Sequence, residues 1–263
     1  MDSEGALAGG GLATSAISDR LRAIRQRIAE AAAAAGRQAG DVGIMLATKT
    51  QDVRAIGSAC EALGEMGLAP PRLGENRSRE GRDKAAALNL PEIAWSMIGH
   101  VQTNKVGEVL AFATEVQSLD RLSLADALER QLQRRGRGLD VLVQVNTSGE
   151  MSKFGLPPSE VRAFLRDLSA YAALRVRGFM TIATLTRDSE ERRRCFRELR
   201  RLRDRERQMA RGGEILTELS MGMSSDYPLA VEEGATCVRL GEAVFGPRSF
   251  RPPGGWWPEG EAA

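Results

Sequence analysis

Short apolar runs alternate with longer amphipathic segments along this chain, and this alternation is the strongest limit on its fold. Runs with the length of buried strands lie at 42–48, 72–75, 95–98, 115–119, 141–146, 175–181, 216–221 and 236–240. Segments typical of helices lie between and before them, at 15–35, 52–66, 77–88, 103–112, 121–135, 158–170, 189–210 and 226–233. Eight strands that alternate with helices predict a parallel sheet with right-handed crossovers.

A closed (β/α)8 TIM barrel accounts for eight such units. The chain has 263 residues, and barrels of about 250 residues are common as single domains. We therefore predict one barrel domain over residues 15–248, with an extra helix before the first strand. A doubly wound open sheet is the alternative, although no Gly-x-Gly-x-x-Gly follows the first strand.

The two ends of the chain differ in composition from the barrel segments. Residues 1–14 are rich in Gly and Ala, and we expect a disordered tail there. Residues 249–263 hold two prolines, several glycines and the pair Trp256-Trp257, and we expect a second tail outside the core. The sequence does not indicate what the two tryptophans contact.

The composition of the chain limits which binding partners and which cellular compartment we expect. The net charge of +2 does not favour nucleic acid or a membrane surface, and no run of about 18 apolar residues is present. The N-terminus lacks the basic start of a signal peptide. Cys60, Cys195 and Cys237 form no CxxC pair, so we expect neither a disulfide framework nor a metal site. These features predict a cytoplasmic protein.

Lysine is rare in this chain, which makes each lysine informative. Only Lys49, Lys84, Lys105 and Lys153 occur among the 37 Lys and Arg residues. Lys49 ends the string VGIMLATKT (42–50), where an apolar strand enters a polar loop. A desolvated ε-amine can lose its proton and form an imine with an aldehyde, which a guanidinium cannot do. An ordinary surface or salt-bridge lysine is the alternative.

The loop after the seventh predicted strand has the composition of a phosphate site. It reads Ser-Met-Gly-Met-Ser-Ser-Asp at 220–226 and opens a helix, where N–H groups and hydroxyls suit a phosphate. Gly241 follows the eighth predicted strand and again exposes backbone N–H groups. Barrels often bind phosphate at the loops after strands seven and eight. An ordinary capped helix is the alternative for the loop alone.

A reactive lysine on the first strand and a phosphate site on the last two strands are neighbours in a closed barrel. This arrangement fits pyridoxal 5′-phosphate (PLP), which carries an aldehyde and a phosphate on one ring. Arg239 could point inward at the ring nitrogen, where a cation disfavours protonation of that nitrogen. A salt bridge from Arg239 to Glu242 or Glu218 is the alternative.

Seven motifs, in order and spacing, resemble the pyridoxal phosphate homeostasis protein family over residues 15–248. They are LATKT at 46–50, GENRSREG at 74–81, IGHVQTNK at 98–105, VQVNTSGEMSKFG at 143–155, RGFMTI at 177–182, LSMGMSSD at 219–226 and VRLGEAVFG at 238–246. Each motif alone is weak, whereas the set is specific. The resemblance implies a (β/α)8 barrel similar to the N-terminal domain of alanine racemase.

The resemblance also implies roles for single residues. Lys49 would hold PLP as a Schiff base, Arg239 would face the pyridine nitrogen, and Asn76 would lie near the ring. Asn146 and Met180 would line the pocket. The phosphate would be held by residues of the last two rim loops, namely Ser220, Gly222, Ser224 and Gly241. Glu242 stands where many relatives carry Ser or Thr, so we expect its carboxylate to point outward.

The sequence favours cofactor binding over catalysis. Alanine racemases add a second domain that supplies a tyrosine as the second base, and this chain ends soon after its last strand motif. Its two tyrosines, Tyr171 and Tyr227, and its one histidine, His100, do not provide an evident second base. We expect a protein that stores, buffers or delivers PLP, with no catalytic residue assigned. A small PLP-dependent amino-acid racemase and a sugar-phosphate enzyme are the alternatives.

Partners other than PLP are less defined by the sequence. Apo PLP-dependent enzymes would receive the cofactor. We expect a monomer, because the second domain of the racemases carries a dimer interface and no such domain is evident in this sequence. Lys105 and Lys153 lie near the predicted mouth, where they are solvent-exposed or attract cofactor.

Overall fold

The structure of the chain, a computed structural model, describes residues 5–68, 71–90, 92–209 and 216–247. Within them eight parallel strands form a closed barrel: β1 (Gly43–Ala47), β2 (Arg72–Glu75), β3 (Ala94–Met97), β4 (Glu115–Leu119), β5 (Leu139–Gln144), β6 (Leu174–Met180), β7 (Glu218–Ser220) and β8 (Cys237–Leu240). Each strand pairs with the next along the chain, and β1 also pairs with β8. The predicted (β/α)8 barrel is confirmed, and the closure excludes the open-sheet alternative.

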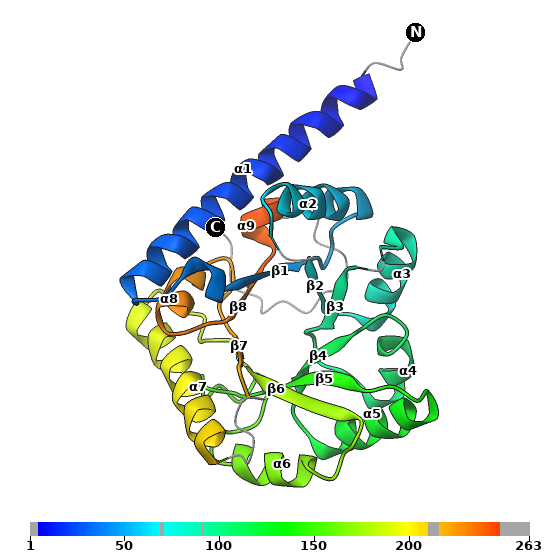
Figure 1. Cartoon of the computed structure of the whole chain (residues 1–263), viewed down its shortest axis with the longest axis vertical. Coiled ribbons are helices and arrows are strands. Elements are labelled where there is room, and N and C mark those ends of the chain that lie inside the picture. The colour runs from blue at the N-terminus through cyan, green and yellow to red at the C-terminus, as the bar shows by residue number, and fades with distance from the viewer. Residues whose placement is uncertain (1–4, 69–70, 91, 210–215, 248–263) are drawn as a thin grey trace.

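Helices surround the strands, as Figure 1 shows. They are α1 (Gly5–Ala34), α2 (Val53–Glu65), α3 (Ser78–Leu88), α4 (Val106–Val109), α5 (Leu122–Arg134), α6 (Val161–Leu168), α7 (Ser189–Met209), α8 (Tyr227–Glu232) and α9 (Glu242–Phe245), with 3-10 turns η1 (Ala39–Asp41) and η2 (Thr103–Lys105). The predicted helices are present within a few residues of their bounds, with two exceptions: the helix predicted at 15–35 begins at Gly5, and 103–112 divides into η2 and α4. Gly107 in that segment lowers its helix propensity.

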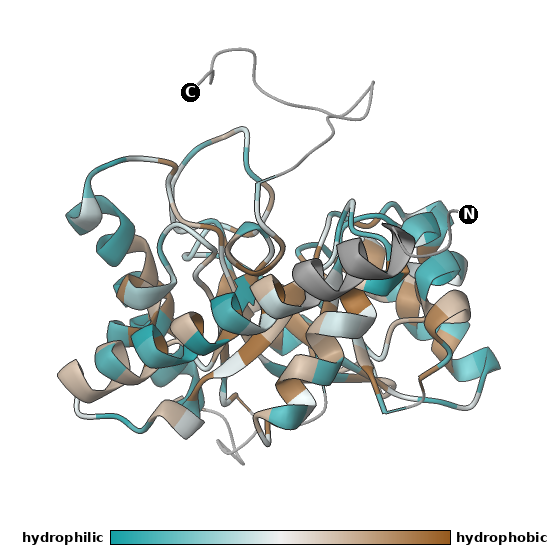
Figure 2. Cartoon of the chain, turned by 90° about the horizontal axis from the view of Figure 1, so that it is seen from above, coloured by the Kyte–Doolittle hydropathy of each residue, from teal (hydrophilic) through white to brown (hydrophobic). Residues whose placement is uncertain are grey.

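An apolar layer lies between the strands and the helices. Leu46, Leu73 and Leu119 from the strands are fully buried there. Helix α7 contributes the buried residues Cys195, Phe196, Leu199 and Leu202 along one face, whereas its arginines lie mostly on the other faces. In Figure 2 hydrophobic positions accordingly concentrate in the inner part of the molecule and hydrophilic ones along the outer helices.

The barrel interior is polar at the amino-terminal ends of its strands. Arg72 lies 2.9 Å from Glu115 and 3.1 Å from Glu218, so one guanidinium bridges two strands across the barrel. Ser96 donates a further hydrogen bond to Glu115. Because each buried carboxylate has a partner, these charges are tolerated in the interior.

Helix α1 covers the outer side of the barrel near β1 and β8. It packs on α2, α8 and α9, and Leu21, Ile24 and Ile28 are buried on its inner face. The extra helix before the first strand is therefore confirmed, but it begins at Gly5, so most of the expected disordered segment 1–14 is helical instead. A helix already formed from residue 15 onward extends at lower cost than a new one nucleates, because propagation fixes fewer dihedrals per hydrogen bond.

The expected tail at 249–263, including Trp256 and Trp257, lies outside the described residues. In the part of the chain that the structure describes, no helix combines the length and the apolar character needed to cross a membrane.

Candidate functional site

Lys49 lies at the carboxyl end of β1, in the turn that leads into α2. It is half-buried, and the preceding residue, Thr48, is fully buried. The Thr48 N–H donates to the Gly74 carbonyl, which extends the pairing of β1 with β2 to the residue before the lysine. Thr50, on the other side, has a φ of 65°, a left-handed conformation that few non-glycine residues adopt. Lys49 is thus carried by a sharp turn with a fixed backbone.

Gly241 brings the loop after β8 against the end of β1. Leu46 and Leu240 are register partners in the sheet. A Cβ atom on residue 241 would lie 3.0 Å from the carbonyl oxygen of Ala47, so glycine permits a closer approach than other residues would. The last rim loop and the turn that carries Lys49 are therefore side by side.

The loop between β7 and α8 is held in a tight conformation by two of its own residues. Gly222 has a φ of 93°, and a Cβ atom there would lie 2.6 Å from the Cβ of Ala230. The Met223 N–H donates to the buried Asp226 carboxylate at 2.6 Å. Burial raises the pKa of Asp226, and the hydrogen bond from Met223 opposes this effect.

Ser224 connects the two loops that the sequence assigns to phosphate. Its hydroxyl accepts a hydrogen bond of 3.1 Å from the backbone N–H of Ala243 in the first turn of α9. Glu242 at the start of α9 is exposed, as expected for a carboxylate that points away from an anion site. The loops after β7 and β8 thus form one connected structure next to the end of β1.

Arg239 is buried inside the barrel and does not form the alternative salt bridges with Glu218 or Glu242. Its guanidinium donates to Ser220 Oγ and to the Thr181 carbonyl, both at 2.8 Å. Burial lowers the pKa of Arg239, but a guanidinium remains charged in proteins. The inward orientation expected from the sequence is present.

A hydrogen-bonded chain leads from Arg239 into the polar interior of the barrel. Ser220 donates to Gln117 Oε1 at 2.7 Å, and Gln117 donates to Glu115 Oε2, also at 2.7 Å. Glu115 is the carboxylate that pairs with Arg72. Ser220 is fully buried, so the structure places its hydroxyl in this chain rather than on the surface of the rim loop.

Asn76 follows β2 and lies against the loop after β3. A Cβ atom on Gly99 would lie 2.2 Å from the Asn76 carbonyl oxygen, so the two backbones are in direct contact. A pocket of about 280 Å³ beside this contact is lined by Asn76, His100 and Lys105, among other residues. Asn76 is therefore at the rim, two strand positions around the barrel from Gly241.

Asn146 and Met180, the two expected pocket residues from the middle of the chain, differ in surroundings. Met180 is fully buried at the end of β6. The Asn146 amide donates to the carbonyls of Glu150 and Lys153, and its oxygen accepts from Ser148 and Gly149. The Asn146 side chain therefore holds the loop after β5 together.

The remaining polar residues near the rim are engaged in local contacts. The His100 ring stacks on Phe154, with ring centroids 3.9 Å apart. Lys105 pairs with Glu108 at 2.8 Å. Lys153 lies 2.7 Å from Glu150 and donates to the Ala183 carbonyl.

The two tyrosines have different surroundings. Tyr171 donates to Asp126 on α5 at 2.7 Å, on the outer side of the barrel. Tyr227 is buried at the start of α8, within the apolar core. The expectations that Tyr171 lies away from the rim and that Tyr227 packs are confirmed.

Sequence reasoning missed Glu115, Gln117 and Lys84, which have polar partners in the interior or next to the site. A signal for the first two exists, because they occupy alternate positions of the string EVQSL at 115–119. Alternation in a strand places both side chains on one face, which here is the barrel interior. For Lys84, the rarity of lysine drew attention to the residue, but nothing in the sequence indicated its partners.

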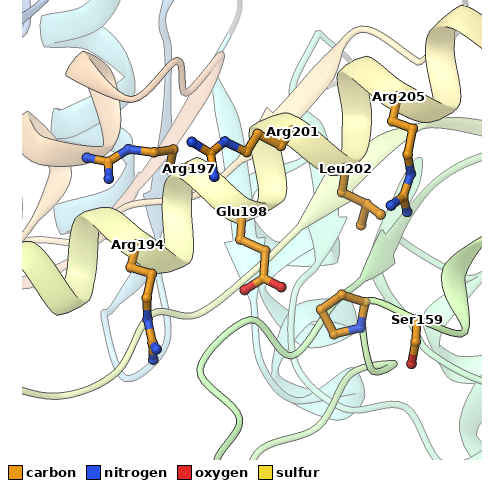
Figure 3. Close-up of a pocket in the computed structure, with 8 residues that line it drawn as sticks. Ser159, Arg194, Arg197, Glu198, Arg201, Leu202 and Arg205 are labelled. Atoms are coloured by element: carbon orange, nitrogen blue, oxygen red, sulfur yellow. The ribbon is translucent and has the colours of Figure 1, made fainter.

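A groove of about 490 Å³ lies elsewhere, between α7 and the start of α6. Figure 3 shows Arg194, Glu198 and Arg205 extending from α7 toward the side where Ser159 lies. None of the residues expected at the cofactor site lines this groove. Among the described residues, no group of His, Cys, Asp and Glu could hold a metal ion.

The fold and the site define a (β/α)8 barrel of the alanine racemase type, with a lysine at the end of its first strand. The family model described as alanine racemase, N-terminal domain, matches residues 13–249. Curated relatives named pyridoxal phosphate homeostasis protein include one from Aquifex aeolicus, 36% identical over 88% of this chain and 98% of the relative. A human relative of the same name is 36% identical over 88% of this chain and 86% of the relative.

The chain therefore belongs to the alanine racemase N-terminal domain family and, within it, to the pyridoxal phosphate homeostasis proteins. Among solved structures, PipY of Synechococcus elongatus PCC7942 with PLP bound is 33% identical. The match has a TM-score of 0.74 and covers 88% of this chain and all of PipY. Alanine racemase from Bartonella henselae shares the fold, with a TM-score of 0.63 and 13% identity over 90% of this chain and 61% of that one.

Proposed function

We propose that this chain binds pyridoxal 5′-phosphate and serves the homeostasis of that cofactor by storing, buffering or delivering it. The family membership, the names of the relatives and the PLP-bound PipY structure support this function. PLP supplies an aldehyde that condenses with an amine, forming one C=N bond and releasing one water molecule. The protein supplies the amine, an anion site and a fixed orientation.

The residues at the rim fit this cofactor. Lys49 would provide the ε-amine for the covalent bond. Arg239 would present its buried guanidinium to the pyridine nitrogen, where a cation disfavours protonation of that nitrogen. Ser224 would donate its hydroxyl proton to the phosphate, and the backbone around Gly222 and Gly241 would complete the anion site. The contacts of Ser220 and Asn146 support roles in holding Arg239 and the β5 loop rather than in touching the phosphate.

The contact between Gly241 and Ala47 is the single observation that carries the proposal. It brings the last rim loop next to the turn that holds Lys49, although the two residues are far apart in the sequence. A ligand bound there can therefore meet an amine at one end and an anion site at the other. This matches the two functional groups on one PLP ring.

The test is an absorption spectrum of the purified protein with PLP, followed by borohydride reduction and peptide mass spectrometry. We expect a visible imine band and a reduced adduct on Lys49. Lys49→Ala should abolish both, whereas Lys105→Ala, which removes an exposed lysine from the same rim, should leave both unchanged. An adduct on another lysine, or none in the unaltered protein, would contradict the proposal.

We further propose that binding, rather than amino-acid turnover, is the main activity. Stereoinversion needs a proton donor on the face opposite the lysine. The contacts of Tyr171 with Asp126 and of Tyr227 with the core leave neither tyrosine available there. Chiral chromatography after incubation with a panel of L-amino acids tests this point, and turnover above the Lys49→Ala variant would favour a racemase.

Delivery to apo PLP-dependent enzymes, from a monomer in the cytoplasm, completes the proposal. The three cysteines are unbridged, which supports a reducing compartment. An apo-enzyme placed with the loaded protein, or separated from it by a membrane that passes only free PLP, tests delivery. Faster reactivation when the two proteins mix would support direct contact, and equal rates would support release into solution. Light scattering after size exclusion measures the oligomeric state.

A further inference from the structure

Lys84 is a buried lysine whose contacts converge on the turn that carries Lys49. It lies on α3 with only 9% of its surface exposed. Its Nζ donates to the Thr48 carbonyl at 2.6 Å, to Glu75 Oε1 at 2.8 Å and to Glu80 Oε1 at 2.6 Å. An ammonium group has three N–H donors, so these three acceptors satisfy it fully.

The acceptors of Lys84 hold the backbone on both sides of Lys49. On one side, Thr48 gives its carbonyl to Lys84 and donates its hydroxyl to Glu75 at 2.6 Å. On the other side, the Thr50 N–H donates to Glu80 Oε1 at 2.7 Å. Glu80 thus helps to fix Thr50 in its left-handed conformation. A cluster of the buried residues Lys84 and Glu75 with the half-buried Glu80 therefore anchors the turn at residues 48–50.

This cluster lies outside the barrel wall, away from the proposed cofactor pocket. The Thr48 side chain faces Glu75 and α3, whereas Ala47 contacts Gly241 at the rim. Side chains alternate along the extended strand that Thr48 continues, so the side chain of Ala47 faces the opposite way from that of Thr48, toward Gly241 at the rim. Lys84 touches neither ring nor phosphate in this arrangement and acts through the backbone.

The cluster depends on a lysine at this position. The second oxygen of Glu75, Oε2, is buried and has no hydrogen-bond partner in the described part of the chain, so that carboxylate relies on Thr48 and Lys84. Burial raises the pKa of Glu75, and the charge of Lys84 opposes this effect. An arginine presents its donors in one plane and does not match three acceptors that converge on a point. This gives a reason for lysine in a chain where only four of 37 such cations are lysine.

We propose that Lys84 is a positioning residue that holds the turn at 48–50 in the conformation that presents the Lys49 amine to the aldehyde of PLP. This inference rests on the proposed function. It predicts that the loss of Lys84 affects covalent binding more than binding of the phosphate.

Two ligands separate these steps: PLP, and pyridoxine 5′-phosphate, which has the same phosphate but no aldehyde. Lys84→Met should weaken PLP binding about tenfold or more, since small displacements of a reacting group have large effects. Its affinity for pyridoxine 5′-phosphate should stay within about twofold of the unaltered protein, because the anion site is on β7 and β8. Lys84→Arg should not restore PLP binding, because of the planar geometry of its donors.

Arg162→Met is the control, because it removes a cation that pairs with a buried carboxylate, Glu206, between α6 and α7, far from the turn at 48–50; Arg205 remains as a second partner of Glu206. It should lower thermal stability without changing the ratio of the two affinities. Glu80→Gln is a second, milder variant, since it keeps the pair of Lys84 with Glu75 and weakens the contact with Thr50. It should weaken PLP binding about threefold with the same selectivity, and it tests the inference if Lys84→Met fails to fold.

The outcomes distinguish this inference from the proposed function. If the unaltered protein forms no covalent adduct with PLP, the proposed function fails. If it forms the adduct and the Lys84→Met and Glu80→Gln variants bind PLP as tightly, the positioning role is overturned. An equal loss of both ligands in the folded variants would also overturn it, because that result indicates a general structural effect.

Discussion

Arg239 donates a hydrogen bond of 2.8 Å to the hydroxyl of Ser220, which itself donates to Gln117. A hydroxyl has one proton to donate, and in Ser220 that proton is already used. The serine therefore links the Arg239 guanidinium, at the proposed cofactor site, to a buried series of hydrogen bonds inside the barrel that starts at Arg72 and Glu115. Ser224, four residues later, reaches the neighbouring rim loop instead.

Ser220 and Ser224 are therefore expected to respond differently to substitution. Ser220→Ala leaves the Gln117 oxygen and one Arg239 N–H buried without a partner, which should lower the free energy of unfolding by about 1–3 kcal/mol. Ser224→Ala should have a smaller effect on stability but weaken pyridoxine 5′-phosphate binding about tenfold, by removing a hydrogen bond to a charged group. Urea unfolding and titration calorimetry measure the two quantities.

The two serines serve as controls for each other. If Ser220→Ala weakens binding of the phosphate ligand more than Ser224→Ala does, Ser220 contacts the phosphate directly, and the interior role assigned to it is wrong.

Two glycines should change stability in opposite directions when replaced by alanine. At Gly222, a Cβ atom would lie 2.6 Å from Ala230, and the φ of 93° disfavours any L-residue. Gly222→Ala should therefore lower the free energy of unfolding by at least about 2 kcal/mol. Gly57 lies inside α2 with open space around it, so Gly57→Ala should raise stability by about 0.5–1 kcal/mol.

Thermal unfolding of both variants provides the measurement. Equal melting temperatures for Gly222→Ala and the unaltered protein would mean that the β7–α8 loop adopts another conformation in solution.

The barrel could be predicted from the sequence because each of its strands has a recognisable local sequence pattern. All eight predicted strands are present, and most of them are short segments rich in apolar residues and bounded by turns. The start of α1 could not be predicted, because a Gly- and Ala-rich segment is weakly specified and takes its structure from the helix that follows.

The positions of the candidate site residues in the barrel were predictable in outline, but their hydrogen-bond partners were not. The adjacency of Lys49 and Gly241 follows from barrel closure, which the number of strands implies. The partners of Ser220 do not follow from local pattern, because Gln117 is 103 positions away in the chain. The same holds for Asn146. The sequence indicates a polar residue at the end of a strand, but only the folded loop shows that its hydrogen bonds are made within 146–153.

Cys60 should react slowly with alkylating reagents. It is half-buried, and burial, with the neighbouring charges of Glu61 and Glu92, raises the pKa of its thiol to about 11. Because the thiolate is the reactive form, its labelling by iodoacetamide at pH 8 should be about 100-fold slower than that of an ordinary cysteine. Mass spectrometry of native and denatured samples measures the rate. Labelling of Cys60 in the native protein at the denatured rate would contradict this environment.

The pKa of His100 reports on the electrostatics of the rim, and its NMR signal is easy to assign because it is the only histidine in the chain. Burial against Phe154 lowers its pKa, and the charge of Arg121 lowers it further. Asp120, 3.7 Å away, raises the pKa but does not prevail, since its charge is already paired with Arg121 at 2.6 Å. The imidazole resonance in proton NMR should therefore titrate with a midpoint below the ordinary value of about 6.5.

The sign of the linked stability change follows from that shift. A lowered pKa means that the folded state prefers the neutral ring, so the contribution of His100 to stability is fully present above about pH 6.5. It is lost as the pH falls through the lowered pKa, because the unfolded chain then binds a proton more readily than the folded one. Unfolding of the unaltered protein and of His100→Gln at pH 7.5 and 5.5 should show a smaller loss on acidification for the variant. A midpoint above 6.5, with the opposite order of losses, would mean that Asp120 rather than burial governs this ring.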